Sequence, residues 1–110
     1  MSFVVRPTAR FMRELKRLRK RYASIDADVE ELGEVLSQEP HQGAPIGMSC
    51  YKVRLAIKSK GKGKSGGARV ITCVIALRES VVLLSIYDKS EQETISDAML
   101  RQMLDDSGLL

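Results

Sequence analysis

The chain has 110 residues, of which 44% are hydrophobic and 29% are charged. This length supports one domain with one core and is too short for two, so we expect a single domain over residues 1–110. The three tyrosines and two phenylalanines, with no tryptophan, leave few platforms on which bases could stack. No secretory leader or bilayer-spanning apolar run is present, and we therefore expect a cytoplasmic protein without membrane contacts.

The basic residues are concentrated in one part of the sequence. Residues 40–78 contain no acidic side chain and eight basic ones, in a chain whose net charge is only +4. The eight are Lys52, Arg54, Lys58, Lys60, Lys62, Lys64, Arg69 and Arg78. Because a block of one sign on a folded scaffold attracts polyanions, nucleic acid is the first partner to consider.

The first forty residues predict a short strand and a helical hairpin. Residues 3–5 are β-prone, and Pro7 is expected to open a helix because it lacks the N–H that a helix start leaves unpaired. Apolar residues then recur at helical spacing in two segments separated by Ser24, which offers an N-cap for the second segment. The two sets are Phe11, Leu15, Leu18 and Tyr22, then Ile25, Val29, Leu32 and Leu36.

The middle of the chain predicts three strands. Residues 39–49 have two prolines and no periodicity, so we interpret them as a loop. Residues 51–58 alternate apolar and basic side chains, which would put Lys52, Arg54 and Lys58 on one face. A glycine-lysine loop at 60–67 leads to a continuous apolar run at 69–77, typical of a central strand. In the last strand, residues 81–87, alternation places Val81, Leu83, Ser85 and Tyr87 on one side.

A final helix is expected from about Ser96, with Met99 and Met103 in the core. Its start could lie earlier, because Ser90 and Glu93 also have capping-box spacing. The predicted order is β-α-α-β-β-β-α. This order describes an α+β fold with a small antiparallel sheet, mixed at the edge, an N-terminal αα-hairpin and a C-terminal helix.

Several kinds of chemistry are poorly supported by the sequence. The segment 61–65, Gly-Lys-Gly-Lys-Ser, lacks the first glycine of a phosphate-binding P-loop, since Lys58 stands there, and a strand pattern follows it. His41 is the only histidine and is best interpreted as a solvated loop residue. Cys50 and Cys73 are far apart in sequence and are expected to be reduced thiols. We therefore expect no metal ion and no cofactor.

The remaining candidates suit cleavage of RNA by attack of a ribose 2′-OH on its own phosphodiester. That reaction needs a base, cations for the developing phosphorane charge, and a proton donor for the departing oxygen. Arginine suits the second role but carries protons poorly, so lysine or tyrosine must do the acid–base work. The candidate catalytic residues are Lys52, Arg54, Arg69, Tyr87 and Lys89, with Lys52 a possible base. The alternative is that the basic residues keep an open sheet face soluble, while Tyr87 only packs.

Four segments resemble RelE-type toxins of bacterial toxin–antitoxin systems, within the RelE/ParE superfamily. They are Phe-Met-Arg-Glu-Leu-Lys-Arg-Leu at 11–18, Tyr-Lys-Val-Arg-Leu at 51–55, the Gly-Lys segment through Arg-Val-Ile at 61–71, and Ile-Tyr-Asp-Lys-Ser-Glu at 86–91. The resemblance implies a single RelE-like domain with mRNA endoribonuclease activity, often in the ribosomal A site. It also implies control by a cognate antitoxin, through which alone operator DNA would be bound.

The same resemblance assigns roles to individual residues. Lys52 and Arg54 match the family's basic strand residues, Arg69 its phosphate-contacting arginine, and Tyr87 its late tyrosine, with Lys89 a further match. From their charge we further predict RNA contacts for Lys58, Lys60, Lys62, Lys64 and Arg78, and we expect the four lysines to be solvated. No histidine stands near the last strand, where some relatives have one, so the general acid is not assigned.

Two other functions are compatible with the same family. The chain could be a gyrase-inhibiting, ParE-like toxin, because that branch shares the fold without the ribonuclease residues. It could also be a non-catalytic protein that binds an antitoxin and acts as a co-repressor. An antitoxin would be expected to lay an acidic or amphipathic segment over the basic face or against the C-terminal helix.

Overall fold

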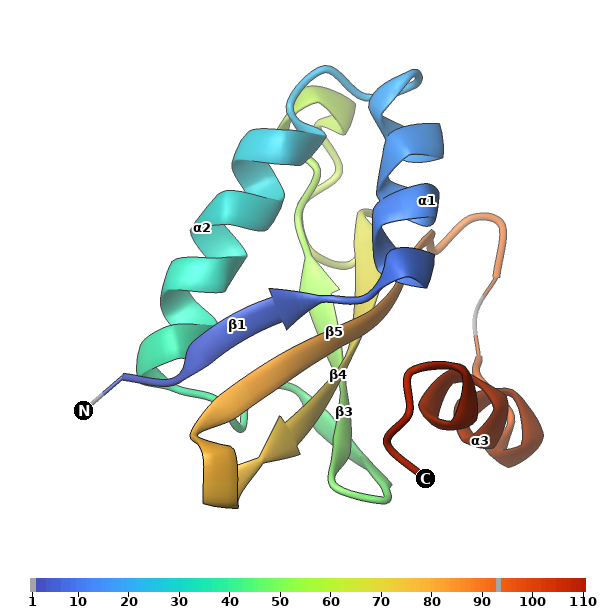
Figure 1. Cartoon of the computed structure of the whole chain (residues 1–110). Coiled ribbons are helices and arrows are strands. Elements are labelled where there is room, and N and C mark those ends of the chain that lie inside the picture. The colour runs from blue at the N-terminus through green and yellow to red at the C-terminus, as the bar shows by residue number, and fades with distance from the viewer. Residues whose placement is uncertain (1, 93) are drawn as a thin grey trace.

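The computed structural model describes residues 2–92 and 94–110. Its main elements in chain order are β1 (Val4–Pro7), α1 (Ala9–Arg19), α2 (Ile25–Gln38), β2 (Ala44–Gly47), β3 (Cys50–Leu55), β4 (Ala68–Ile75), β5 (Ser80–Asp88) and α3 (Asp97–Asp106). Two single-turn 3-10 helices, η1 (Lys58–Lys60) and η2 (Ala76–Arg78), flank β4. The predicted α+β class is confirmed (Figure 1).

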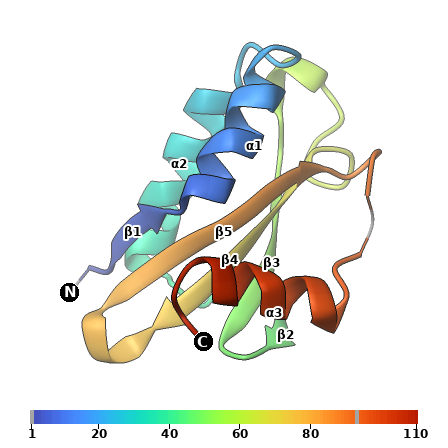
Figure 2. The ribbon, with the colours of Figure 1, turned by 45° about the vertical axis from the view of Figure 1, so that its right-hand side comes forward.

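The five strands form one sheet in the order β1-β5-β4-β3-β2. All neighbours are antiparallel except β1 and β5, which are parallel, so the sheet is mixed at one edge as expected. The hairpin of α1 and α2 covers one face of the sheet, and α3 lies against the other (Figures 1 and 2). Two apolar clusters result, one under the hairpin and one under α3.

Helix α1 begins at Ala9, two residues after the expected start at Pro7. Pro7 does not open it but ends β1, where it pairs with Leu83. Thr8 is the N-cap, and its hydroxyl accepts a hydrogen bond from the amide of Phe11 at 3.2 Å and donates to the carbonyl of Leu83 at 2.9 Å. A proline is tolerated in β1 because this strand is at the sheet edge.

Strand β2 was not predicted. The sequence predicted three strands after the helical hairpin, and the structure has four. Residues 44–47 pair antiparallel with β3, although Pro45 and Gly47 remove any alternation. An edge strand needs only one partner and tolerates proline, which is why its sequence resembles a loop. The observed order is β-α-α-β-β-β-β-α.

Strand β3 ends at Leu55, three residues before the predicted boundary. Lys58 therefore lies in η1 and does not share a strand face with Lys52 and Arg54. Helix η1 is instead hydrogen-bonded to the first turn of α2 and its N-cap. The amide of Lys58 donates to the carboxylate of Asp28 at 3.2 Å, and the amide of Ser59 donates to the hydroxyl of Ser24 at 2.8 Å. These contacts fasten η1 to the start of α2.

A bulge in β5 changes which residues share its faces. Ile71 pairs with Ser85 and Thr72 pairs with Leu83, so Leu84 is an extra residue on β5. Strict alternation would have kept Tyr87 on the side of Leu83. Instead Leu83 packs under the hairpin, whereas Tyr87 packs in the cluster under α3.

Helix α3 starts where expected, with Ser96 as its N-cap accepting a hydrogen bond from the amide of Met99 at 3.1 Å. The alternative start involves Glu93, which lies outside the described residues. Leu100, Met103 and Leu104 are buried, but Met99 is 39% exposed, so its assignment to the core was wrong. Among the described residues, no helix combines the length and apolar character needed to cross a membrane.

Candidate functional site

Three of the predicted catalytic residues form one row across the sheet. Arg54 of β3 pairs with Arg69 of β4, which in turn pairs with Tyr87 of β5. Lys52 precedes Arg54 by two residues on β3 and so shares its face. The cluster under α3 includes Tyr87 at this end of the face and Cys73 toward the other. The β5 bulge is what places Tyr87 in this row.

The members of the row differ in exposure. Arg54 is exposed and Lys52 is half-buried, whereas Arg69 and Tyr87 are each only 5% exposed. Arg54 and Lys52 can therefore contact a large polyanion directly. Arg69 and Tyr87 are largely shielded from solvent by the residues around them.

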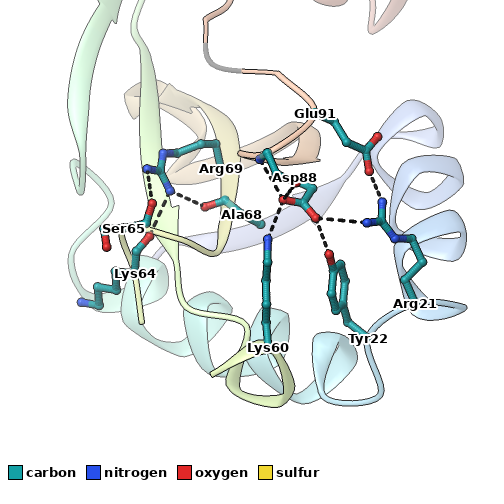
Figure 3. A network of polar contacts seen from close by, with 10 residues as sticks. Arg21, Tyr22, Lys60, Lys64, Ser65, Ala68, Arg69, Asp88 and Glu91 are labelled. Atoms are coloured by element: carbon teal, nitrogen blue, oxygen red, sulfur yellow. Dashed lines mark hydrogen bonds and ion pairs between the residues drawn. The ribbon is translucent and has the colours of Figure 1, made fainter. Parts of the chain in front are cut away.

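The buried guanidinium of Arg69 holds the glycine-lysine loop. It donates to the carbonyl oxygens of Lys64 at 3.0 Å, Ala68 at 3.0 Å and Ser65 at 3.2 Å (Figure 3). The loop also runs very close to β3, because a Cβ atom on Gly67 would lie 2.1 Å from the carbonyl oxygen of Leu55. Only glycine fits there. Arg69 therefore contributes to the site by shaping the loop that carries Lys62 and Lys64.

Tyr87 places a hydroxyl group in the interior beside this arginine. Within the described residues, its oxygen has no hydrogen-bond partner. Burial raises the pKa of Tyr87, and the nearby Arg69 offsets only part of that effect. The hydroxyl therefore keeps its proton at neutral pH and could donate it.

Most of the predicted site lysines and arginines line two hollows. One, of about 530 Å³, is lined by Lys52, Arg54 and Lys64 together with residues 42–44. The other, of about 400 Å³, is lined by Lys60, Lys62 and Lys89 together with Ser65, Gly66 and Ser90. The loop contributes to both, so its lysines connect the two groups of predicted site residues.

Two of the predicted RNA-binding lysines have carboxylate partners. Lys58 lies 2.8 Å from Glu31 at the surface. Lys60, expected to be solvated, is only 14% exposed in its side chain and lies 2.9 Å from the fully buried carboxylate of Asp88. The hydrogen bond with Asp88 raises the pKa of Lys60. The main role of Lys60 is therefore structural.

Arg78 is not part of this site. It lies in η2, after the far end of β4, whereas Arg69 lies near the start of that strand. The six residues of β4 that follow Arg69, at about 3.3 Å per residue, place η2 about 20 Å along the sheet from it.

Asp88 is a central residue that the sequence analysis missed. Its carboxylate accepts hydrogen bonds from the Tyr22 hydroxyl, from Lys60, and from the amide and hydroxyl of Ser90 at 2.9 and 2.8 Å (Figure 3). Arg21, which also pairs with Glu91, lies 3.8 Å from it. Asp88 thus connects the end of α1, η1 and the segment after β5. The only signal in the sequence is an aspartate that ends an apolar strand two residues before a serine.

No three histidine, cysteine, aspartate or glutamate side chains of the described residues lie close enough together to hold a metal ion. His41 contacts the hydroxyl of Tyr51 at 3.0 Å through Nδ1. Both residues lie outside the row of Arg54, Arg69 and Tyr87.

Neither a protein-family profile nor a curated protein sequence matches the chain. Solved structures do match. An Escherichia coli RelE mutant in the free state superposes with a TM-score of 0.63 at 20% identity, covering 92% of this chain and 98% of that one. The toxin–antitoxin complex RelBE2 of Mycobacterium tuberculosis gives 0.61 at 22% identity, covering 80% and 99%. This chain has the RelE fold.

A third match with the RelE fold is the intact E. coli RelBE toxin–antitoxin complex, with a TM-score of 0.56 at 23% identity. It covers 80% of this chain and 96% of the matched chain. The alignments span nearly the whole of each RelE chain, so the likeness is to a complete RelE domain. The architecture predicted from the sequence is thereby confirmed at the level of the fold.

Proposed function

We propose that this protein is the toxin of a type II toxin–antitoxin system and an endoribonuclease that cleaves mRNA without a metal ion. The observation that supports this most directly is the row of Arg54, Arg69 and Tyr87, bordered by Lys52 and the lysine loop, in a domain with the RelE fold. A gyrase inhibitor would not need a proton donor beside an arginine on this face.

The reaction is an in-line displacement at phosphorus. The ribose 2′-oxygen forms a new bond to phosphorus while the bond to the 5′-oxygen breaks, which leaves a 2′,3′-cyclic phosphate and a free 5′-hydroxyl. The proton of the 2′-hydroxyl passes to a base, and another proton reaches the leaving 5′-oxygen. Arg54 and the loop lysines stabilise the extra negative charge on the phosphorane.

The two proton-transfer roles fall to different residues. Tyr87 is our candidate donor to the 5′-oxygen, because burial keeps its hydroxyl protonated. Since that hydroxyl is shielded from solvent, this role requires the residues that cover it to move when RNA binds. Lys52 is the candidate base, since it lies on the same sheet face and lines the hollow with Arg54. Lys89 borders the other hollow with Lys62 and is the candidate for binding the flanking phosphate.

The proposed partners are an antitoxin and the ribosome. Exposed cations on the row and the loop would attract the acidic segment of an antitoxin as well as RNA, so inhibition can follow from direct occupation of the face. Ribosomal RNA has the same phosphodiester backbone as mRNA and would be attracted to the same cations. Cleavage of the same mRNA with and without ribosomes separates ribosome-dependent activity from free ribonuclease activity.

The test is induced expression without an antitoxin, with mapping of new mRNA 5′ ends across open reading frames. Wild type is expected to generate 5′ ends inside codons, and Arg54→Ala to reduce them at least tenfold, since one charge-assisted phosphate contact contributes about 1.5–3 kcal/mol. Arg78→Ala is the matched control, because it removes the same exposed charge from the far end of β4.

Growth arrest with intact mRNA and broken DNA would favour a gyrase inhibitor instead. Absence of growth arrest in wild type would favour the co-repressor. Equal losses in Arg54→Ala and Arg78→Ala would mean that overall charge matters and that the row is not the active site.

A further inference from the structure

The two cysteines of the chain, separated by 23 positions in sequence, are direct neighbours in the sheet. Cys50 of β3 pairs with Cys73 of β4, and both are buried in the cluster under α3. Both thiols point to one acceptor, the carbonyl oxygen of Met48, at 3.3 Å from Cys50 Sγ and 3.9 Å from Cys73 Sγ. The sulfur atoms therefore share one small space.

The backbone around this pair has the geometry that a cross-strand disulfide requires. The amide of Val74 donates to the carbonyl of Ser49 at 2.9 Å, so the ladder hydrogen bond joins residues 49 and 74, and Cys50 and Cys73 form the adjacent non-hydrogen-bonded pair. In such pairs the Cα atoms lie about 4.5 Å apart and the side chains are closest. Disulfides span Cα separations of about 4.4–6.8 Å, so a bond can form without moving the strands.

We propose that Cys50 and Cys73 form a redox-sensitive dithiol that hydrogen peroxide oxidises to an intrachain disulfide. This inference is independent of the proposed ribonuclease activity. In the first step the Cys73 thiolate attacks one oxygen of hydrogen peroxide and the O–O bond breaks, which forms a sulfenic acid. The leaving hydroxide takes up the proton that the Cys73 thiol released and becomes water. In the second step the Cys50 sulfur attacks the sulfenic sulfur, the S–O bond breaks, and a second water leaves with the proton of Cys50. Two thiols are oxidised and one peroxide is reduced to two waters.

The environment makes the two thiols unequal, which suits them to these two roles. A hydrogen bond with Cys50 lowers the pKa of Cys73 to about 7, against the opposing effect of burial. The pKa of Cys50 is raised by the same contact with Cys73 and by burial. Cys73 is also the more exposed of the two, at 6% against 1% for Cys50. A thiolate that peroxide can reach is the nucleophile in oxidation, so Cys73 reacts first and Cys50 resolves the product.

The bond would act on the turn and helix around it. Met48 and Ser49, which both have positive φ angles, form the turn that enters β3, and α3 covers the pair with Leu100, Met103 and Leu104. A disulfide here fixes the register of β3 against β4 beneath α3. It therefore rigidifies the end of the sheet opposite Arg54 and Arg69.

The test exposes the reduced, purified protein to hydrogen peroxide and follows intact mass, thiol alkylation and thermal unfolding. Wild type is expected to lose both thiols together and two hydrogen atoms of mass, with Tm rising by at least about 5 °C and returning after dithiothreitol. Cys50→Ser, which keeps Cys73, should instead accumulate a sulfenic acid that dimedone traps. Cys73→Ser should react at least about tenfold more slowly.

Three results would overturn the proposal. They are retention of both thiols at peroxide concentrations that oxidise an exposed cysteine peptide, disulfide-linked dimers in place of the intrachain product, and an oxidised form with a lower Tm. Circular dichroism of both serine variants, measured before peroxide is added, checks that each is folded. The double variant Cys50→Ala/Cys73→Ala should show no Tm change with peroxide.

Discussion

The ammonium group of Lys60 lies 2.9 Å from a carboxylate oxygen of Asp88, whose side chain is completely shielded from solvent. This contact joins η1 to the last residue of β5, across the base of the glycine-lysine loop. The amide of Lys89 also donates to the carbonyl of Gly67 at 3.1 Å. The loop that lines both hollows is therefore held at its two ends by different interactions, the Lys60–Asp88 pair at one and Arg69 at the other.

Replacing Lys60 by methionine should destabilise the protein strongly. The variant removes the cation nearest to the buried carboxylate of Asp88 and leaves Arg21, at 3.8 Å, as its remaining ion-pair partner, and breaking a buried pair in this way costs up to about 3 kcal/mol. The free energy of unfolding from urea titration measures the effect. Lys62→Met is the matched control, because Lys62 is exposed in the same loop, and it should change stability by no more than about 0.5 kcal/mol. Similar values for the two variants would contradict a structural role for the pair.

The same carboxylate predicts an acid-sensitive fold. Burial alone would raise the pKa of Asp88, but hydrogen bonds from Lys60, Tyr22 and Ser90 outweigh it and hold the pKa well below its usual range. Because the folded-state pKa is below the unfolded value of about 3.9, this stability is present above pH 4 and is lost as pH falls further. The free energy of unfolding between pH 2 and 6 should fall less steeply below pH 4 in Asp88→Asn than in wild type. Parallel curves would assign the acid sensitivity to other carboxylates.

Helices and strands with a regular spacing of apolar residues could be predicted from the sequence. Elements whose conformation depends on contacts with distant residues could not. The helices around Leu15 and Leu32 follow from apolar spacing alone. Strand β2 could not be predicted, because the pairing of Pro45 with Tyr51 depends on a partner strand and not on a pattern of its own. The β5 bulge likewise has no signal in the sequence, because Leu84, the extra residue, is an apolar side chain like its neighbours in the strand.

The candidate site was predicted in part for the same reason. Charge pattern and alternation placed Lys52 and Arg54 on one face, and the structure adds Arg69 beside them. Exposure was not predictable. Nothing in a glycine-lysine segment distinguishes Lys60, which reaches a buried carboxylate, from Lys62, which remains in solvent, because that difference is set by Asp88 on a strand 28 positions away.

Tyr87→Phe should separate activity from stability. The hydroxyl of Tyr87 is buried and has no hydrogen-bond partner among the described residues, so its removal should leave the free energy of unfolding unchanged within about 1 kcal/mol, or raise it. If this hydroxyl donates a proton to the 5′-oxygen, mRNA cleavage should nevertheless fall by roughly 10²-fold or more. Thermal unfolding and single-turnover cleavage are measured on the same preparation. Full activity in a stable variant would remove Tyr87 from the mechanism and leave it a packing residue.

Arg69→Ala should release the loop while the sheet remains folded. The carbonyl oxygens of Lys64, Ser65 and Ala68 would lose a charged donor, each such hydrogen bond contributing about 1.5–3 kcal/mol. Local opening that costs even 1.4 kcal/mol less is tenfold more frequent. Limited trypsin digestion should therefore cut after the lysines of this loop at least about tenfold faster than in wild type.

The digestion pattern distinguishes loop release from general unfolding. Cleavage confined to positions 62 and 64 reports local opening, whereas simultaneous cleavage after Arg17 in α1 would report loss of the whole fold. Arg54→Ala is the control, because it removes the paired arginine on β3, which makes no hydrogen bond to the loop within the described residues, and should leave the digestion rate unchanged. An unchanged pattern in Arg69→Ala would mean that Gly67 and the Lys60–Asp88 pair suffice to hold the loop, and Arg69 would then be free to bind phosphate.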